Sequence, residues 1–160
     1  MELNLFRRKS VTPRLEQLRA LVLFVDLTPA ELAIVDGWLH ERSYLKDEVI
    51  FDAGEEGQAI YVVLEGEVLI CRQGEPASGR IATLGPGMFF GELALLDDAP
   101  RSAQARALAP CKLIVFFRED FTNLLDTHGR IASKIARQLA RHIGARLREL
   151  ALAAGAHQHL

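Results

Sequence analysis

Residues 90–103 combine a glycine, a carboxylate and a single arginine in a pattern that suits ligand binding. Gly91 precedes a helix-prone run at 92–96, and the unpaired N–H groups at a helix start attract anions. Arg101 lies nine residues after Glu92, and its planar guanidinium can donate two hydrogen bonds to one phosphate. An ionised Glu92 only accepts hydrogen bonds, which suits a sugar hydroxyl. The two sites together describe a ribose phosphate, although the spacing equally allows an ordinary Glu92–Arg101 salt bridge.

Short apolar runs surround this segment and predict the strands that position it. They lie at residues 49–51, 60–64, 68–71, 81–84 and 113–117, separated by glycines and other turn residues. Closely spaced short strands favour an all-β roll or barrel. Residues 64–67 predict a tight hairpin in which Gly66 adopts a positive φ.

Helical patterns flank the predicted strands. A looser helix is expected over residues 13–23, and Thr28, Pro29 and Glu31 form the signature of a capping box at a second helix. Beyond residue 118 the helical period returns, with an apolar stripe at Ile131, Ile135, Leu139, Ile143, Leu147 and Leu150. A four-residue step winds around a helix. We therefore expect the roll to cover the first part of the stripe and a second subunit the later part, with a loose tail from residue 153.

The sequence from Phe90 to Leu96, FGELALL, followed by PRSA from Pro100 to Ala103, closely resembles the phosphate-binding cassette of the cyclic nucleotide-binding domain family. That family includes catabolite activators and the regulatory subunits of cAMP-dependent protein kinase. The resemblance extends over residues 24–147. It implies an α+β fold: an eight-stranded antiparallel β-roll, jelly-roll-like (a double-stranded β-helix), flanked by N-terminal helices and a long C-terminal helix.

The resemblance also implies one domain over residues 1–160. The helical lead-in would occupy 1–40, the β-roll 41–117 with the cassette at 90–103, and the hinge and C-terminal helices 118–155.

Within the cassette, the resemblance assigns a role to each residue. Glu92 would accept from the ribose 2′-hydroxyl and Arg101 would clamp the phosphate. The backbone of Gly91, Leu93 and Ala94 would complete the anion cradle, Ser102 would add its N–H, and Ala103 would continue the strand with a small side chain.

The residues around the base are less specific. Val62, Leu64, Ile81 and Leu84 either line the base pocket or belong to the core. The match places His142 and Arg146 near the base, where Arg146 either stacks on it as a cation–π lid or lies on a solvated helix face.

The resemblance implies a sensor that binds cAMP or cGMP and repacks its C-terminal helices, with no catalytic residue, cofactor or metal. None of the five histidines falls in an expected strand, which argues against a metal enzyme or haem sensor, and Cys71 and Cys111 read as buried hydrophobes. The alternatives are a fragment of a ligand-responsive transcription regulator and a nucleotide-free interaction scaffold. Because few residues follow Leu150, no recognition helix and no direct DNA binding are expected.

The charge distribution suggests where a partner would bind. Residues 26–67 hold eleven acids and two bases, whereas residues 130–148 hold six bases and no acid. Such blocks are either solvated faces or a basic helix opposite an acidic partner, a subunit or a nucleic acid. A homodimer or protein partner is expected through Ile143, Leu147 and Leu150, or on the basic face of Arg130, Lys134, Arg137 and Arg141. No apolar run is long enough to cross a bilayer, so a cytoplasmic location without membrane contact is expected.

Overall fold

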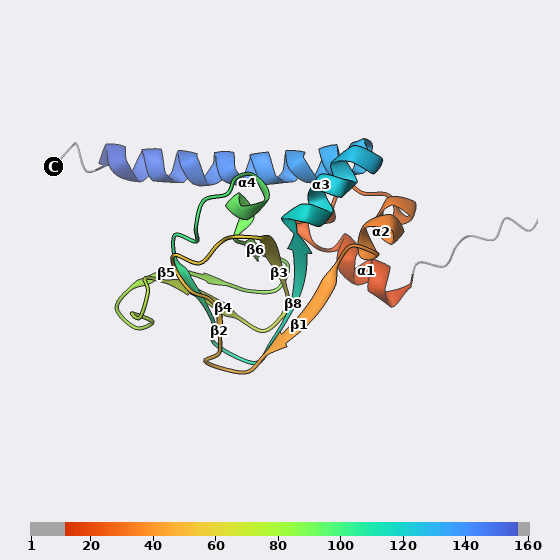
Figure 1. Cartoon of the computed structure of the whole chain (residues 1–160). Helices are drawn as coiled ribbons and strands as arrows, with labels where there is room; N and C mark the ends of the chain where they lie inside the picture. The colour runs from red at the N-terminus through yellow and green to blue at the C-terminus, as the bar shows by residue number, and fades with distance from the viewer. Residues whose placement is uncertain (1–11, 157–160) are drawn as a thin grey trace, which may run out of the picture.

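The computed structural model describes residues 12–156. Helix α1 (Pro13–Arg19), the 3-10 turn η1 (Val22–Phe24) and helix α2 (Pro29–Asp36) form the lead-in. Eight strands follow, with the 3-10 helix η2 (Glu92–Leu95) after the sixth: β1 (His40–Tyr44), β2 (Val49–Phe51), β3 (Ala59–Glu65), β4 (Val68–Cys71), β5 (Arg80–Leu84), β6 (Phe89–Phe90), β7 (Gln104–Ala107) and β8 (Cys111–Phe117). Helices α3 (Arg118–Thr127) and α4 (Gly129–Ala156) complete this part of the chain, and α4 spans the molecule along one side (Figure 1).

The strands form two antiparallel four-stranded sheets, ordered β1-β8-β3-β6 and β2-β7-β4-β5. Alternate side chains of β3 enter two different cores. Ile60, Val62 and Leu64 face the core shared with the helices, whereas Ala59, Tyr61 and Val63 face the roll interior. Because both faces of β3 are covered, its sequence is a continuous apolar run without alternation. The predicted α+β architecture with an antiparallel β-roll is confirmed.

The predicted capping box at the start of α2 is confirmed. The Thr28 hydroxyl accepts from the Glu31 N–H at 3.2 Å, and the Glu31 carboxylate accepts from the Thr28 N–H at 3.3 Å. Burial would raise the pKa of Glu31, but the hydrogen bonds from Lys134 and Thr28 outweigh burial and lower that pKa. The carboxylate is therefore held in its charged form at the junction between the lead-in and α4.

Polar contacts fasten the basic face of α4 to the acidic lead-in. The Nζ of Lys134 donates to Oε1 of Glu31 at 2.6 Å, and the Gln138 amide donates to the Asp26 carboxylate. A guanidinium nitrogen of Arg141 lies 3.8 Å from the same Asp26 carboxylate. The acidic partner of two cations on this face therefore lies within the chain itself.

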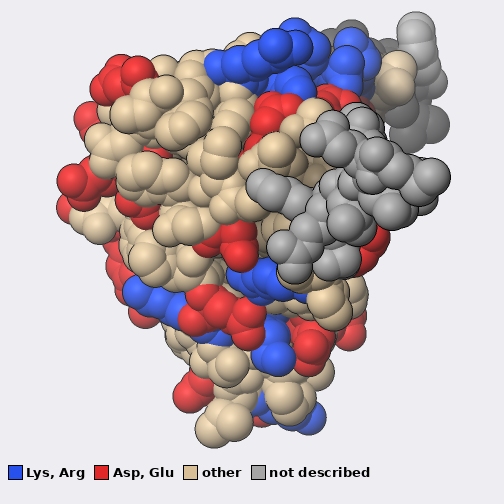
Figure 2. Space-filling model, turned by 90° about the vertical axis from the view of Figure 1, so that its right-hand side faces the viewer, with Lys and Arg blue, Asp and Glu red and all other residues tan. Residues whose placement is uncertain are grey.

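The remaining cations of that face, Arg130 and Arg137, are exposed. Figure 2 shows Lys and Arg atoms gathered at the top of the molecule, with Asp and Glu atoms directly beneath them. The charge asymmetry of the sequence thus serves partly to dock α4 and partly as a solvent-facing surface.

The apolar stripe of α4 divides into a covered half and an uncovered half. Ile131, Ile135 and Leu139 are buried in the core shared with α1, η1, α2 and α3. Leu147 and Leu150 keep 61% and 66% of their surface exposed. The division was predicted, but the cover comes from the other helices as well as from the outer face of the β1-β8-β3-β6 sheet.

The hairpin predicted at residues 64–67 is wrong. Strands β3 and β4 belong to different sheets, so this turn carries the chain from one sheet to the other. Gly66 does adopt a positive φ of 90°, and a Cβ there would lie 2.4 Å from the Pro110 carbonyl oxygen. The turn therefore packs against the start of β8, and this close approach as well as the φ requires glycine.

The helix expected over residues 13–23 ends early. Leu21, Leu23 and Phe24 are all buried, and one straight helix cannot turn residues two apart toward the same core. Accordingly α1 stops at Arg19 and Leu21 is extended, with ψ at 131°. The 3-10 turn that follows buries both Leu23 and Phe24.

Two element boundaries also differ from expectation. β1 begins at His40, one residue before the expected roll, so the expectation that no histidine lies in a strand is wrong. Its residues are mostly exposed, and its pairing with β8 rather than any apolar pattern makes it a strand. Helix α4 continues to Ala156, beyond the expected tail start at residue 153, and residues 157–160 lie outside the described range.

Candidate functional site

The cassette backbone turns sharply at Gly91. This residue caps η2 with φ 73° and ψ 22°, a left-handed conformation that other residues adopt at a cost. The turn directs the start of η2 toward Arg101: a Cβ on Gly91 would lie 2.5 Å from Nη1 of Arg101. Glycine is therefore needed both for the turn and for the close approach of the guanidinium.

Two backbone carbonyls fix the Arg101 guanidinium. Its Nη1 donates to the Gly91 carbonyl at 3.1 Å, and its Nη2 donates to the Ala59 carbonyl at 2.7 Å. The Arg101 backbone also pairs with the turn before β3, donating to the Glu55 carbonyl at 2.8 Å. The arginine is thus held to the cassette on one side and to β3 on the other.

Two aromatic rings lie beneath the guanidinium, and a third ring packs against them. Its Cζ lies 4.2 Å from the centroid of Phe51 and 5.7 Å from that of Tyr61. Phe90 stacks on Tyr61, with centroids 5.3 Å apart and planes within 12°. A ring face attracts a cation, and more strongly where water is excluded. The rings therefore favour the charged guanidinium and fix its plane.

The charge of Arg101 is not neutralised by a carboxylate. Burial lowers the pKa of Arg101, and the nearby Tyr61, Glu55 and Glu92 oppose that shift. Within residues 12–156 no carboxylate oxygen lies within salt-bridge distance of the Arg101 nitrogens, so its fixed partners are two carbonyls and the rings. An arginine stays protonated even when its pKa falls. The site therefore carries a partly desolvated positive charge that an anion would neutralise.

Glu92 pairs with the C-terminal helix and not with Arg101. Its side chain is 9% exposed, and its Oε1 lies 3.2 Å from Nη1 of Arg146 on α4. The Glu92–Arg101 salt bridge that the spacing allowed is therefore absent from the described residues. Arg146 is 54% exposed, yet its guanidinium reaches the cassette, so it does more than lie on a solvated face.

The other expected site residues take different positions. Ala94 is buried, whereas Leu93 is 51% exposed. Ser102 is exposed in a bend. The expectation that Ala103 continues a strand is wrong, because β7 starts one residue later at Gln104. Arg101 thus faces the Gly91 and Ala59 carbonyls, Glu92 faces Arg146 of α4, and Ser102 is exposed.

The candidates for the base pocket fall into two buried residues and two that are at least partly exposed. Val62 and Leu64 are buried in the core shared with the helices, as the core interpretation predicted. Ile81 is 54% exposed, and Leu84 is partly buried against the roll interior. On α4 the His142 ring lies 4.3 Å from Phe89, centroid to centroid, so His142 packs on the end of β6.

Sequence reasoning missed the residues that support Arg101. Phe51 reads as one more apolar residue of a short strand, and Ala59 contributes only its carbonyl oxygen. A Cβ on Gly57 would lie 3.0 Å from the Ala94 Cβ and 3.5 Å from the Arg101 Nε. A glycine before a strand was the one available signal, because it marks close approach of another segment.

Other kinds of site find little support in residues 12–156. This range holds no cluster of three or more histidine, cysteine, aspartate or glutamate residues placed to bind a metal ion. Both cysteines, Cys71 and Cys111, are buried and unpaired, as predicted. No helix in the described range combines the length and apolarity that a membrane span requires.

Comparison with known proteins agrees with this geometry. The family model described as "Cyclic nucleotide-binding domain" matches residues 41–128, which is more than half of the chain. The "Cyclic AMP receptor protein" of Thermus thermophilus is 39% identical over 122 residues, covering 76% of this chain and 56% of its own length. The "cAMP-dependent protein kinase regulatory subunit" of Mycosarcoma maydis is 30% identical over 121 residues, covering 72% of this chain and 23% of its own.

Comparison with solved structures finds a similar fold in a protein of the same organism, Thermus thermophilus. The crystal structure of Thermus thermophilus Catabolite Activator Protein superposes with a TM-score of 0.75 at 36% identity. The superposition covers 86% of this chain and 63% of that one. The chain thus spans only part of the longer proteins it resembles.

Proposed function

The chain belongs to the cyclic nucleotide-binding domain family, and from this premise we propose that it binds cAMP or cGMP and passes the binding signal to its C-terminal helices. Both relatives above carry cAMP in their names, which makes cAMP the first ligand to test. The binding itself requires no catalytic group, and the proposed role is that of a regulatory module.

The observation that carries the proposal is the state of Arg101. A guanidinium held by two carbonyls and a ring face has its geometry fixed before any ligand arrives. Its charge remains without a carboxylate among the described residues, and Gly91, which caps η2, accepts from it. A cyclic phosphate would supply the missing negative charge and accept from the guanidinium and from the N–H groups at the start of η2.

Glu92 supports the ribose part of the proposal. Arg146 contacts Oε1, and Oε2 has no hydrogen-bond partner within residues 12–156. A 2′-hydroxyl can therefore donate to Oε2 while Arg146 keeps its contact with Oε1. On this account Arg146 holds α4 closed over an occupied site as a lid, and it does not compete with the ligand.

The contact between Arg146 and Glu92 suggests how ligand binding would reach the C-terminal helices. A ligand that adds contacts to the cassette favours the arrangement in which Glu92 and Arg146 meet. The ligand then shifts the population toward the closed helix arrangement by its differential affinity for that state. Repacking of α3 and α4 is the expected output.

The output surface that we propose is the uncovered end of α4. Leu147 and Leu150 are 61% and 66% exposed, and they continue the stripe whose first half is buried. A second copy of the chain would bury this stripe against its own equivalent. A Leu147→Glu variant is expected to be monomeric by sedimentation under conditions where the wild type dimerises. A monomeric wild type would refute the homodimer and would indicate that a different protein covers this end of α4.

The test of the binding proposal is calorimetric titration with cAMP, cGMP and 5′-AMP. Losing one partner of a buried charge pair costs about 2–5 kcal/mol, so Arg101→Ala is expected to weaken binding roughly 30-fold to several thousand-fold. Arg72→Ala is the matched control, because Arg72 lies in the β4–β5 connection with its side chain 68% exposed. Equal affinity of wild type and Arg101→Ala would overturn the assignment of Arg101 to the phosphate.

A further inference from the structure

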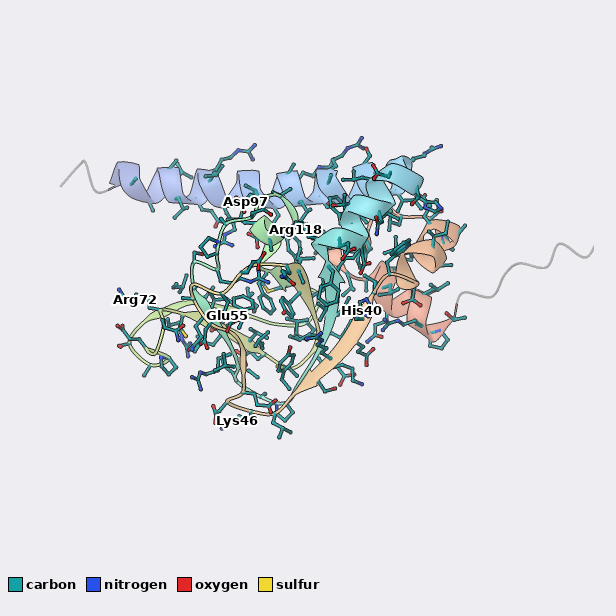
Figure 3. The ribbon with its side chains drawn as sticks, in the orientation of Figure 1. His40, Lys46, Glu55, Arg72, Asp97 and Arg118 are labelled. Carbon is teal, nitrogen blue, oxygen red and sulfur yellow. The ribbon has the colours of Figure 1, made fainter. Side chains whose placement is uncertain are left out.

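Arg118 joins three segments that are distant in the sequence. It is the first residue of α3, and its Nη1 donates to the Asp97 carbonyl at 2.8 Å and to the Gly57 carbonyl at 3.3 Å. The same nitrogen lies 2.8 Å from Oδ1 of Asp98. Figure 3 shows Arg118 and Asp97 side by side, at the place where the cassette passes the start of α3.

The position of Arg118 is electrostatically unfavourable for a cation. The N-terminus of a helix carries partial positive charge, so it favours acidic residues and disfavours arginine. The residue before it, Phe117, also provides no side-chain cap for α3. Glu119 and Asp120 in the same turn and the contacts of the guanidinium together offset this cost, and those contacts are made with the cassette and with the turn before β3.

The carbonyl contacts matter more than the ion pair. Asp98 is 91% exposed, and an exposed ion pair contributes little because water screens it. Arg118 is only 25% exposed, and its hydrogen bond to the Gly57 carbonyl is partly buried, whereas its bond to the Asp97 carbonyl is exposed. The Gly57 contact is thus the best-shielded part of the link, and the shorter Asp97 contact joins Arg118 to the cassette.

Both of these contacts lead directly to the proposed ligand site. Asp97 ends the turn after η2, with its N–H donating to the Leu93 carbonyl at 3.0 Å. Gly57 lies against the cassette and Arg101, as the near contacts of an added Cβ with Ala94 and the Arg101 Nε indicate. A shift of the cassette toward a phosphate would therefore move the Asp97 acceptor of Arg118, and Gly57, the other acceptor, packs against the same segment.

The other end of the link is the helical core. Phe121 and Leu124 of α3 are buried in the same cluster as Ile131 and Ile135 of α4. A displacement at the first residue of α3 is therefore passed to α4 through close-packed side chains.

We propose that Arg118 is a positioning residue that couples the cassette to α3 and α4. The ligand-dependent part of this inference rests on the proposed function, whereas the mechanical link stands on the contacts of Arg118 alone. Arg118→Met removes every side-chain donor but keeps an unbranched stem and the backbone N–H bond to the Gln58 carbonyl, and Arg118→Lys keeps the charge. Asp98→Asn removes the ion pair alone, and Arg72→Gln is an arginine control far from α3 (Figure 3).

The first experiment is hydrogen exchange without ligand. We expect Arg118→Met to speed amide exchange about 10-fold or more both in residues 92–101 and in the first turns of α3, since a hydrogen bond to a charged group stabilises by about 1.5–3 kcal/mol. Arg118→Lys should recover part of the protection, and both controls should match the wild type. Unchanged exchange in the cassette of Arg118→Met would overturn the link, whether or not the protein binds a nucleotide.

The second experiment repeats the exchange with saturating cAMP or cGMP. We expect Arg118→Met to bind with a modest loss of affinity, about 10-fold at most, while the ligand no longer changes exchange in α3 and α4. An Arg118→Met variant whose helices respond as the wild type does would refute the coupling role. A wild type that binds neither nucleotide would refute the proposed function, and the ligand-free exchange would still decide the mechanical link.

Discussion

Comparison of Gly91→Ala with Gly87→Ala separates the cost of backbone strain from the cost of displacing Arg101. Gly91 has φ 73°, and left-handed backbone costs an alanine about 1–2 kcal/mol. The new Cβ would also lie 2.5 Å from Nη1 and 3.3 Å from Cζ of Arg101, so the guanidinium must move. The substitution should therefore weaken both the fold and the proposed phosphate clamp.

The two effects have different magnitudes and a matched control. At about 2–4 °C per kcal/mol for a chain of this size, the strain lowers Tm by roughly 2–8 °C. Loss of the fixed guanidinium geometry removes charge-assisted hydrogen bonds worth about 1.5–3 kcal/mol, which is roughly 10- to 150-fold in affinity. Gly87 has a similar φ of 86°, but nothing lies within 4 Å of its added Cβ. Gly87→Ala should therefore show the fall in Tm without the loss of affinity.

Thermal unfolding and calorimetric titration with cAMP and cGMP measure both quantities on the same preparations. We expect Gly91→Ala to have the lower Tm, because it also disturbs the Arg101 hydrogen bonds to the Gly91 and Ala59 carbonyls, and to show a selective loss of binding. If Gly87→Ala lost as much affinity as Gly91→Ala, strain alone would explain the effect. If Gly91→Ala bound as the wild type does, the requirement for a fixed Arg101 would be refuted.

Three further predictions concern the surroundings of the site and the docking of α4. Phe51→Leu should weaken cyclic nucleotide binding by roughly 2- to 30-fold in titrations, since a cation–π contact is worth about 0.5–2 kcal/mol, whereas Phe51→Tyr should retain most of it. Glu92→Gln should weaken cAMP binding about 10-fold or more but leave 2′-deoxy-cAMP unaffected; equal losses for both ligands would contradict the hydroxyl assignment. Because the pKa of Glu31 is lowered in the folded state, its contact with Lys134 stabilises the fold above the unfolded pKa, near 4.3, and is lost as the pH falls through the folded pKa. Urea unfolding at several pH values should therefore show a stability gap between wild type and Glu31→Gln that is largest above about pH 5 and closes in acid.

Sequence patterns located the strands that contain short apolar runs, which are β2, β3, β4, β5 and β8. β3 and β8 are buried on nearly every residue, and their continuous apolar runs were sufficient to locate them. β1 and β7 were not located, because β1 is mostly exposed and β7 follows the cassette with a mixed pattern. The two residues of β6 are too few for any periodicity. The misassigned hairpin has a related cause, since a positive φ at Gly66 marks a turn but not which strands it joins.

The candidate site was predictable only where chemistry is local. Gly91, Glu92 and Arg101 lie within one short segment, so residue types and spacing were enough to suggest a ribose-phosphate site, although the same spacing equally allowed a Glu92–Arg101 salt bridge. The contact between Glu92 and Arg146 joins residues 54 positions apart, and the Arg118 contact with Gly57 joins residues 61 apart. Such pairs depend on how α3 and α4 pack against the roll, which no local pattern encodes. An arginine at the first position of a helix, against the helix dipole, was the one sequence sign of the second pair.

The most direct test of the central claim is thermal unfolding of the wild type with cAMP, cGMP and 5′-AMP. A ligand at 100 times its Kd adds about 2.7 kcal/mol, so the cyclic nucleotide that fits should raise Tm by roughly 5–10 °C. The proposal predicts this rise with cAMP or cGMP and little change with 5′-AMP, whose phosphate is not closed onto the ribose. An unchanged Tm with both cyclic nucleotides at millimolar concentration would contradict the claim that Arg101 and Glu92 form a cyclic nucleotide site.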